Sequence, residues 1–145
     1  MHMRGTPKTM QTGDLSSPAI AEEVAGFLAS RCQHLERLGV SPDRLCVDPG
    51  IGFGKTLEQN LHLQTNLKPL RALNRPILMG ASRKSFIGSL TGRPSSERVW
   101  GTAASVAVSV WLGVHIVRVH DVKAMNDVVR VANALARSAG GHGFE

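Results

Sequence analysis

Short apolar runs alternate along this chain with longer segments in which apolar residues recur every three or four positions. The short runs predict β-strands, and the longer segments predict amphipathic α-helices. Four such rounds follow one another, and their predicted strands span residues 1–3, 45–47, 77–79 and 116–119. The predicted helices span residues 17–38, 56–67, 96–112 and 122–138, with a short helical turn near residues 86–87. Strands that alternate with helices are typical of parallel βα repeats joined by right-handed crossovers.

The same pattern sets the fold class, which we predict to be α/β. The strands are short and mostly apolar, as in a parallel sheet that is covered on both faces. Four βα units make either half of an eight-stranded TIM barrel or a small open sheet. In both folds ligands bind at the carboxyl ends of the strands. Polar residues follow three of the predicted strands here: Asp48, residues 82–84 and residues 120–121.

The first and third main helices make specific predictions about packing. Ser17 fits the N-cap of the first helix, with Pro18 in its first turn, and Gly39 fits its C-terminus. The apolar positions expected to face the core are Ile20, Val24, Phe27, Leu28, Leu35 and Leu38. Trp100 and Trp111 share one face of the third main helix, and we expect both to pack.

Asp48 precedes a glycine-rich segment that ends in Gly54-Lys55-Thr56. A Walker A motif needs glycine where this chain has Pro49, and the three glycines form G-x-G-x-G rather than a dinucleotide-binding fingerprint. One interpretation is a flexible loop without a ligand. However, a carboxylate at the end of an apolar strand is costly to bury without donors. A ligand that offers two N–H groups on one edge, such as a pterin, would suit it.

Cations follow the third and fourth predicted strands. Lys84 can donate to a carbonyl or ring nitrogen, and Ser85 with its neighbouring amides can bind an anion at a helix start. Arg118 shares a strand face with His120, so it can stack on a flat ring or pair with phosphate. His120 can bind phosphate, shuttle a proton or be structural, whereas Asp121 is most simply the N-cap of the last helix.

The composition narrows the class of partner. The apolar fraction of 42% is that of a globular domain, and the net charge of +6 favours anionic partners. Because the basic residues are scattered and Tyr is absent, phosphorylated small molecules are a better match than nucleic acid. No apolar run reaches the ~20 residues of a membrane span, and residues 1–4 lack the apolar region of a signal peptide.

Metal and disulfide sites are not expected. No pair of histidines has zinc-site spacing, so we predict no metal held by the protein alone. Cys32 and Cys46 fit small core residues without a disulfide framework, which is typical of a reducing compartment such as the cytoplasm.

Taken together, four segments resemble bacterial dihydropteroate synthase. They are Met1–Met10, Asp48–Lys55, Gly80–Ser85 and Arg118–Val122, in the family's order and spacing. The family fold is a complete TIM barrel of about twice this length. The resemblance implies that residues 1–145 form its carboxyl-terminal half, from the end of the fifth strand through the eighth helix, with no second domain.

The resemblance implies a transferase of folate biosynthesis that condenses 4-aminobenzoate with 6-hydroxymethyl-7,8-dihydropterin pyrophosphate, releases pyrophosphate and is inhibited by sulfonamides. The residues it assigns to catalysis are Lys84, Arg118 and His120. Those it assigns to substrate binding are Met3, Asp48, Gly52, Phe53, Gly80, Lys84, Ser85, Arg118 and His120. In the family, the pterin edge binds the equivalent of Asp48, and the pyrophosphate binds the equivalents of Arg118 and His120. The aminobenzoate pocket is framed by Phe53 and Ser85.

The resemblance also implies Mg²⁺, bound mainly through the substrate pyrophosphate and the amino-terminal half of the family barrel. That half supplies further pterin ligands, so the chain alone is expected to have little activity. A homodimer, or dependence on the other half, is expected. Two alternatives are a non-catalytic half-barrel that binds pterin or phosphate and a pterin-dependent methyltransferase barrel. Residues 82–84 and 118–121 argue against the methyltransferase, because they suit aminobenzoate and pyrophosphate.

Overall fold

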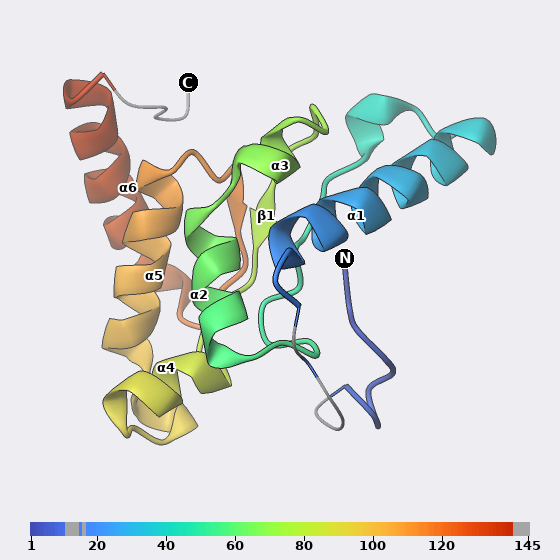
Figure 1. Cartoon of the computed structure of the whole chain (residues 1–145). Helices are drawn as coiled ribbons and strands as arrows, with labels where there is room; N and C mark the ends of the chain where they lie inside the picture. The colour runs from blue at the N-terminus through green and yellow to red at the C-terminus, as the bar shows by residue number, and fades with distance from the viewer. Residues whose placement is uncertain (11–14, 16, 141–145) are drawn as a thin grey trace.

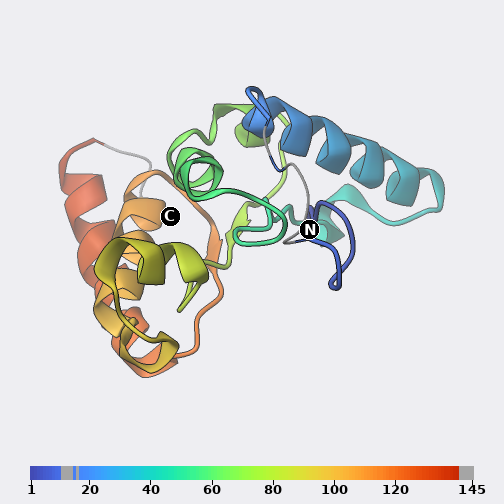
Figure 2. The same cartoon turned by 60° about the horizontal axis from the view of Figure 1, so that its bottom comes forward.

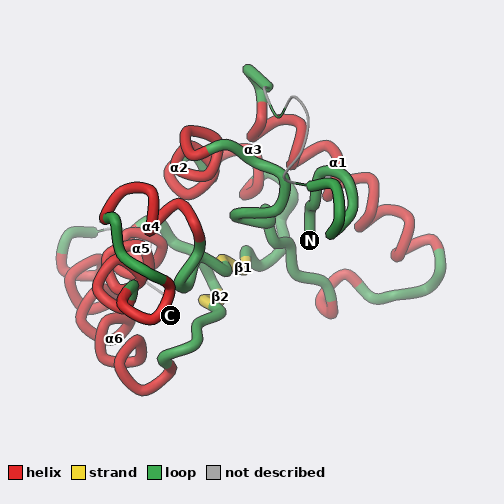
Figure 3. Tube along the Cα trace, turned by 90° about the horizontal axis from the view of Figure 1, so that it is seen from below, coloured by secondary structure: helices red, strands yellow, loops and turns green. Residues whose placement is uncertain are grey.

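A computed structural model describes residues 1–10, 15 and 17–140 of the chain (Figure 1). Its helices are α1 (Ile20–Arg37), α2 (Leu57–Thr65), α3 (Lys68–Arg71), α4 (Ser85–Thr91), α5 (Val99–Trp111) and α6 (Val122–Ser138). Two short 3-10 helices are η1 (Pro42–Arg44) and η2 (Ser95–Glu97). Viewed from below, the helices follow one another in an arc around the strands (Figure 3). This arrangement is that of part of an α/β barrel, as predicted.

The central sheet is parallel, as the alternation of elements predicts. Strand β1 (Leu78–Met79) pairs with β2 (Ile116–Val117), and Val47 forms a single parallel bridge with Ile77. The paired segments are shorter than the predicted strands. Residues 1–3 form no strand, because their one bond to the neighbouring segment is from the His2 amide to the Asp48 carbonyl, at 3.0 Å.

Helix α1 differs from the prediction in the residue at which it begins and in the burial of its last apolar residues. It begins at Ile20 with Ala19 at the N-cap, so Ser17 and Pro18 precede the helix, whereas Gly39 follows it with φ +88°, as expected. Its amino-terminal apolar side chains are buried, but Leu35 and Leu38 are 38% and 69% exposed. Figures 1 and 2 show the reason, since the carboxyl-terminal half of α1 extends away from the strands.

Helix α5 corrects the prediction that both tryptophans pack. Its buried residues are Thr102, Val106, Ser109 and Val110, which lie on one helical face. The opposite face carries Trp100 and Trp111, which are 82% and 48% exposed. The helix also begins at Val99 rather than residue 96, because residues 95–97 form η2.

Two apolar clusters hold the fold together. The larger joins α1, α3 and α4 to the strands through side chains such as Val24, Ile77 and Ile87, and the smaller lies between α5 and α6 around Val110 and Met125. Cys46 is exposed, against the prediction of a core position. None of the described helices combines the length and the apolar character needed to cross a bilayer.

Candidate functional site

The segments that follow the two strands meet at a cavity of about 430 Å³. It is lined by Gly80, Ser82, Arg83, Lys84, Ser95, Arg118, Val119 and His120. Four of these were predicted from the sequence as site residues, namely Gly80, Lys84, Arg118 and His120. Parallel strands bring them together, because β1 and β2 end at the same edge of the sheet.

Two cations define the electrostatics of this cavity. Arg118 lies against the backbone of Gly80, where an added Cβ would be 3.5 Å from the guanidinium Nε. Burial and the nearby Arg118 charge both lower the pKa of Lys84. An anion in the cavity would relieve this repulsion, so the arrangement favours a negatively charged ligand group.

The imidazole of His120 is oriented by a buried hydroxyl. Its Nδ1 lies 3.0 Å from Ser82 Oγ, and the same oxygen accepts the His120 backbone N–H at 3.2 Å. Ser82 is only 4% exposed, whereas His120 itself is exposed, so the contact is part-buried and leaves the ring accessible to a ligand. With Nδ1 engaged, Nε2 is the ring nitrogen left to contact a ligand.

Asp121 has a different role from the predicted N-cap. It occupies the N-cap position of α6, but its side chain makes no cap hydrogen bond. Instead both carboxylate oxygens accept from the Arg83 guanidinium, at 2.6 and 3.1 Å. This pairing lowers the pKa of Asp121 and offsets the charge of Arg83, so Lys84 and Arg118 remain the principal cations of the cavity.

The glycine-rich loop after Val47 positions Asp48. Its Oδ1 accepts the Gly50 amide at 2.7 Å, and its side chain is half-buried. The ammonium of Lys55, only 5% exposed, donates to the carbonyls of Gly50 and Phe53, at 2.8 and 3.0 Å. Burial lowers the pKa of Lys55 to about 8. The buried Lys55 ammonium therefore holds two turns of this loop together through their carbonyl groups.

Asn60 on α2 holds the same loop from the other side. Its Oδ1 accepts the Gly52 amide at 2.7 Å, and its Nδ2 donates to the Thr56 carbonyl at 2.7 Å. Thr56 and Gln59 form a capping box that starts α2 beside it. These bonds argue against the flexible-loop interpretation.

Lys84 links this loop to the cavity. Its Nζ lies 3.9 Å from the centre of the Phe53 ring, a cation–π geometry. Because Gly52 has no side chain, it leaves room for the Lys84 stem; an added Cβ would lie 3.2 Å from Lys84 Cδ. The structure thus brings Gly52 and Phe53 to the same lysine that lines the cavity.

Two predicted residues lie at the margin. Met3 is half-buried and follows His2, whose amide binds the Asp48 carbonyl, so it lies near the acid end of the loop. Ser85 begins α4 and is exposed, and it does not line the cavity. Their contacts with substrate stay predictions.

Comparison with known proteins decides the family. The family model described as pterin binding enzyme matches residues 1–120. The chain belongs to this pterin-binding enzyme family. Among curated relatives, the dihydropteroate synthase of Synechocystis is 45% identical over 142 residues, and that of Neisseria meningitidis serogroup B is 45% identical over 139. The matches cover 94% and 93% of this chain but 47% and 48% of the relatives.

Solved structures of pterin-binding enzymes agree on the fold. The Yersinia pestis dihydropteroate synthase in complex with a sulfonamide drug has a TM-score of 0.90 at 35% identity. It aligns with 95% of this chain and 50% of its own. The Burkholderia cenocepacia enzyme complexed with 7,8-dihydropteroate has a TM-score of 0.84 at 43% identity, over 95% of this chain and 52% of its own. The chain therefore spans about half the length of the synthases it matches.

Several residues that support the candidate site were not predictable from the sequence. In the sequence Ser82 is one hydroxyl of a basic segment, although in the structure it orients His120. Lys55 follows a glycine-rich segment that lacks the Walker A pattern, and Asn60 lies on a predicted helix with no further signal. The ring of His120 and the folded backbone of the glycine-rich loop are positioned by the fold.

The buried His2 makes stability depend on pH. Burial lowers the pKa of its imidazole from 6.5 to about 4, and its ring packs edge-on against Phe27, with 5.0 Å between centroids. The unfolded chain therefore binds more protons than the folded chain between these values, so stability falls as the pH drops from 6.5 toward 4. Allowing for partial hydration, we expect a loss of about 2 kcal/mol between pH 7.5 and 4.5.

Urea unfolding at both pH values measures this loss. The variant His2→Phe keeps a ring against Phe27 and removes the titrating group. Its free energy of unfolding should therefore fall by about 2 kcal/mol less than that of the parent between the two pH values. An equal loss in the variant and the parent would show that His2 does not cause it.

Proposed function

We propose that this chain forms about half of a dihydropteroate synthase. The reaction joins 4-aminobenzoate to 6-hydroxymethyl-7,8-dihydropterin pyrophosphate: a C–N bond forms at the pterin methylene, its C–O bond breaks, pyrophosphate leaves, and the amine nitrogen releases one proton to solvent. The observation that carries the proposal is the position of Lys84. It connects a cationic cavity to the Asp48 loop, as a substrate with a flat donor edge and a charged tail requires.

The cationic side of the site suits the leaving group. Arg118 and the oriented His120 line the cavity with Lys84, and together they stabilise negative charge that develops on the departing pyrophosphate. Asp48 accepts N–H groups from the pterin edge through the carboxylate that Gly50 orients. The Phe53 ring, against Lys84, forms an apolar wall for 4-aminobenzoate.

Support for these ligands also comes from the relatives. The Yersinia pestis enzyme was solved with a sulfonamide drug, and the Burkholderia cenocepacia enzyme with 7,8-dihydropteroate. We extend both ligand classes to this site as part of the proposal.

Mg²⁺ remains part of the proposed reaction but is not assigned to this chain. Among the described residues, no group of three or more His, Cys, Asp or Glu side chains converges. The described residues therefore offer no cluster of oxygen ligands of the kind that Mg²⁺ prefers. We propose that the pyrophosphate and the part of the synthase that this chain does not match carry the ion.

The decisive experiment joins this chain to the portion of the Synechocystis synthase that it does not match. We expect this chimera to release pyrophosphate when given both substrates, and the 145-residue chain alone to release at most a trace. A chimera that folds and binds pterin pyrophosphate but never turns over would support a binding module instead. Full turnover by the chain alone would contradict the proposed division of the site.

We also propose that the synthase dimerises through α5 and α6 and works in the cytoplasm, where free cysteines such as Cys32 remain reduced. Between these helices lies a groove lined by Ala107, Asp127, Val128, Val131, Ala132 and Leu135. Val131 and Leu135 are 61% and 58% exposed, so apolar side chains of this groove face solvent where a second copy could cover them.

Sedimentation velocity tests the dimer. We expect twice the mass of one chain, and a monomer after Val131→Glu, because a buried charge disfavours an apolar interface. Lys123→Glu, on the same helix, is the control and should leave the mass unchanged. A parent chain that sediments as a monomer would contradict this interface.

A further inference from the structure

The backbone that carries Lys84 is held in an unfavourable conformation. Arg83 has φ +56°, in the left-handed region that residues other than glycine rarely adopt. Such a conformation is strained and persists only where surrounding contacts fix it. The Arg83 amide donates to Thr102 Oγ1 at 3.0 Å, which is one such contact from α5.

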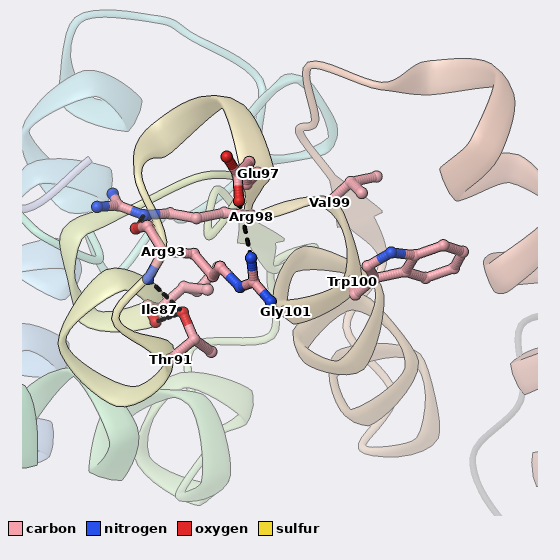
Figure 4. A pocket seen from close by; sticks show the side chains of 8 residues that line it. All are labelled: Ile87, Thr91, Arg93, Glu97, Arg98, Val99, Trp100 and Gly101. Atoms are coloured by element: carbon pink, nitrogen blue, oxygen red, sulfur yellow. Dashed lines mark hydrogen bonds and ion pairs between the residues drawn. The ribbon is translucent and has the colours of Figure 1, made fainter.

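Arg98 supplies the contacts to the carbonyl groups of this turn. Its Nη1 donates to the Arg83 carbonyl at 3.0 Å and to the Lys84 carbonyl at 3.3 Å. Its Nε donates to the Arg93 carbonyl at 2.9 Å, which fixes the direction of the side chain. Figure 4 shows the Arg98 guanidinium and the Trp100 ring pointing in opposite directions, although the two residues are close in the chain.

Gly88 on α4 leaves the space that the Arg98 guanidinium occupies. A Cβ on Gly88 would lie 2.1 Å from Arg98 Nη2 and 2.5 Å from Cζ, closer than any real contact. Gly88 lies within a helix, where glycine is less favourable than alanine. The close approach of the guanidinium gives a physical reason for glycine at this position.

We propose that Arg98 is a positioning residue whose guanidinium, passing over Gly88, holds the Arg83 and Lys84 carbonyls and so fixes the Lys84 side chain against Phe53. Arg98 itself does not line the 430 Å³ cavity. It acts through Lys84, whose ammonium lies 3.9 Å from the Phe53 ring centre. The importance of this position for catalysis rests on the proposed function, whereas the coupling of Arg98 to Lys84 does not.

The position of Lys84 can be measured without any substrate. The chain has five lysines, at positions 8, 55, 68, 84 and 123, so a lysine-specific ¹³C label gives few side-chain signals. Among the described residues, Lys84 is the lysine whose ammonium lies over an aromatic ring, and the ring current shifts its ε-methylene signal upfield. The Lys84→Arg variant lacks the Lys84 signal and so assigns it. The Phe53→Leu variant removes the ring and so measures how much of the upfield shift the ring current causes.

Three variants of the full chain then test the proposal. We expect Arg98→Ala to abolish more than half of the upfield shift and Arg98→Lys to retain part of it, since lysine can still donate to one carbonyl. Gly88→Ala should reproduce the effect of Arg98→Ala, because the new methyl displaces the flexible end of the arginine while favouring the helix. Combining Gly88→Ala with Arg98→Ala should add nothing further.

Gly26→Ala is the matched control, since Gly26 also lies within a helix but has no heavy atom within 4 Å of the added Cβ. It should leave the Lys84 signal unchanged. If Arg98→Ala does not fold, Gly88→Ala answers the question alone. An unchanged upfield shift in Gly88→Ala, or an equal loss in Gly26→Ala, would overturn the proposal. An inactive chimera would count against the proposed function without affecting this result.

Discussion

Replacing Gly50 by alanine should lower the free energy of unfolding by about 4 kcal/mol, the largest stability effect of a single methyl group that we expect in this chain. Gly50 has φ +71°, and an added Cβ would lie 1.8 Å from the backbone carbonyl oxygen of His2. Because that oxygen belongs to a backbone, it cannot rotate away. The chain segment before Arg4 must move, and with it the His2 amide that binds Asp48.

Gly39 provides the matched control for this prediction. It has φ +88° but no heavy atom within 4 Å of the added Cβ, so Gly39→Ala carries the conformational penalty without the clash. We expect it to cost about 1 kcal/mol. Urea unfolding of both variants at pH 7.5 makes the comparison. Equal losses would show that the close approach of His2 contributes nothing.

Replacing Asp48 by asparagine should lower the kcat/KM of the chimera for pterin pyrophosphate by about 100-fold. The asparagine carbonyl can still accept the Gly50 amide, so the loop keeps its shape. What changes is the second oxygen, which becomes an N–H₂ group facing the donor edge of the pterin. A charge-assisted hydrogen bond is replaced by two opposed donors, a loss of about 3 kcal/mol.

The control separates a lost contact from a lost charge. Asp43 is exposed in η1, and Asp43→Asn changes the net charge equally without touching the loop or the proposed dimer groove. It should leave kcat/KM unchanged. Thermal unfolding of the two variants should also agree with the parent within about 1 °C, since neither side chain is fully buried. An Asp48→Asn chimera with parental kcat/KM would remove Asp48 from the proposed pterin site.

Much of the site was predictable because strand ends are visible in a sequence. The alternation of apolar runs and helices located Asp48, Lys84 and His120 directly after strands, and parallel pairing brings the last two to one cavity. The same reasoning grouped Arg118 with His120, and both line that cavity. Helix packing was less predictable, since a periodic apolar pattern shows which face is apolar and not whether a neighbour covers it. Leu38 on α1 and Trp100 on α5 are exposed for this reason.

Asp121 illustrates a different limit. Its place before α6 predicted an N-cap, and it does occupy that position. However, its carboxylate accepts hydrogen bonds from Arg83 and makes none to the helix backbone. A charged bidentate partner outweighs a cap hydrogen bond to a neutral amide. Because Arg83 is 38 residues away in the chain, no local pattern could have shown the competition.

The sequence by itself determined the parallel βα order, the family resemblance and the identity of the residues that end each strand, because local periodicity and short motifs encode them. Only the tertiary structure decided how those residues are held. Ser82 beside His120 and Arg98 across Gly88 bind atoms that the fold alone brings within reach. Lys55 binds carbonyls of its own loop, and the tertiary packing decides that its ammonium is buried there. A hydrogen bond requires its partners within about 3 Å and in line, and sequence spacing cannot specify that for residues on different elements.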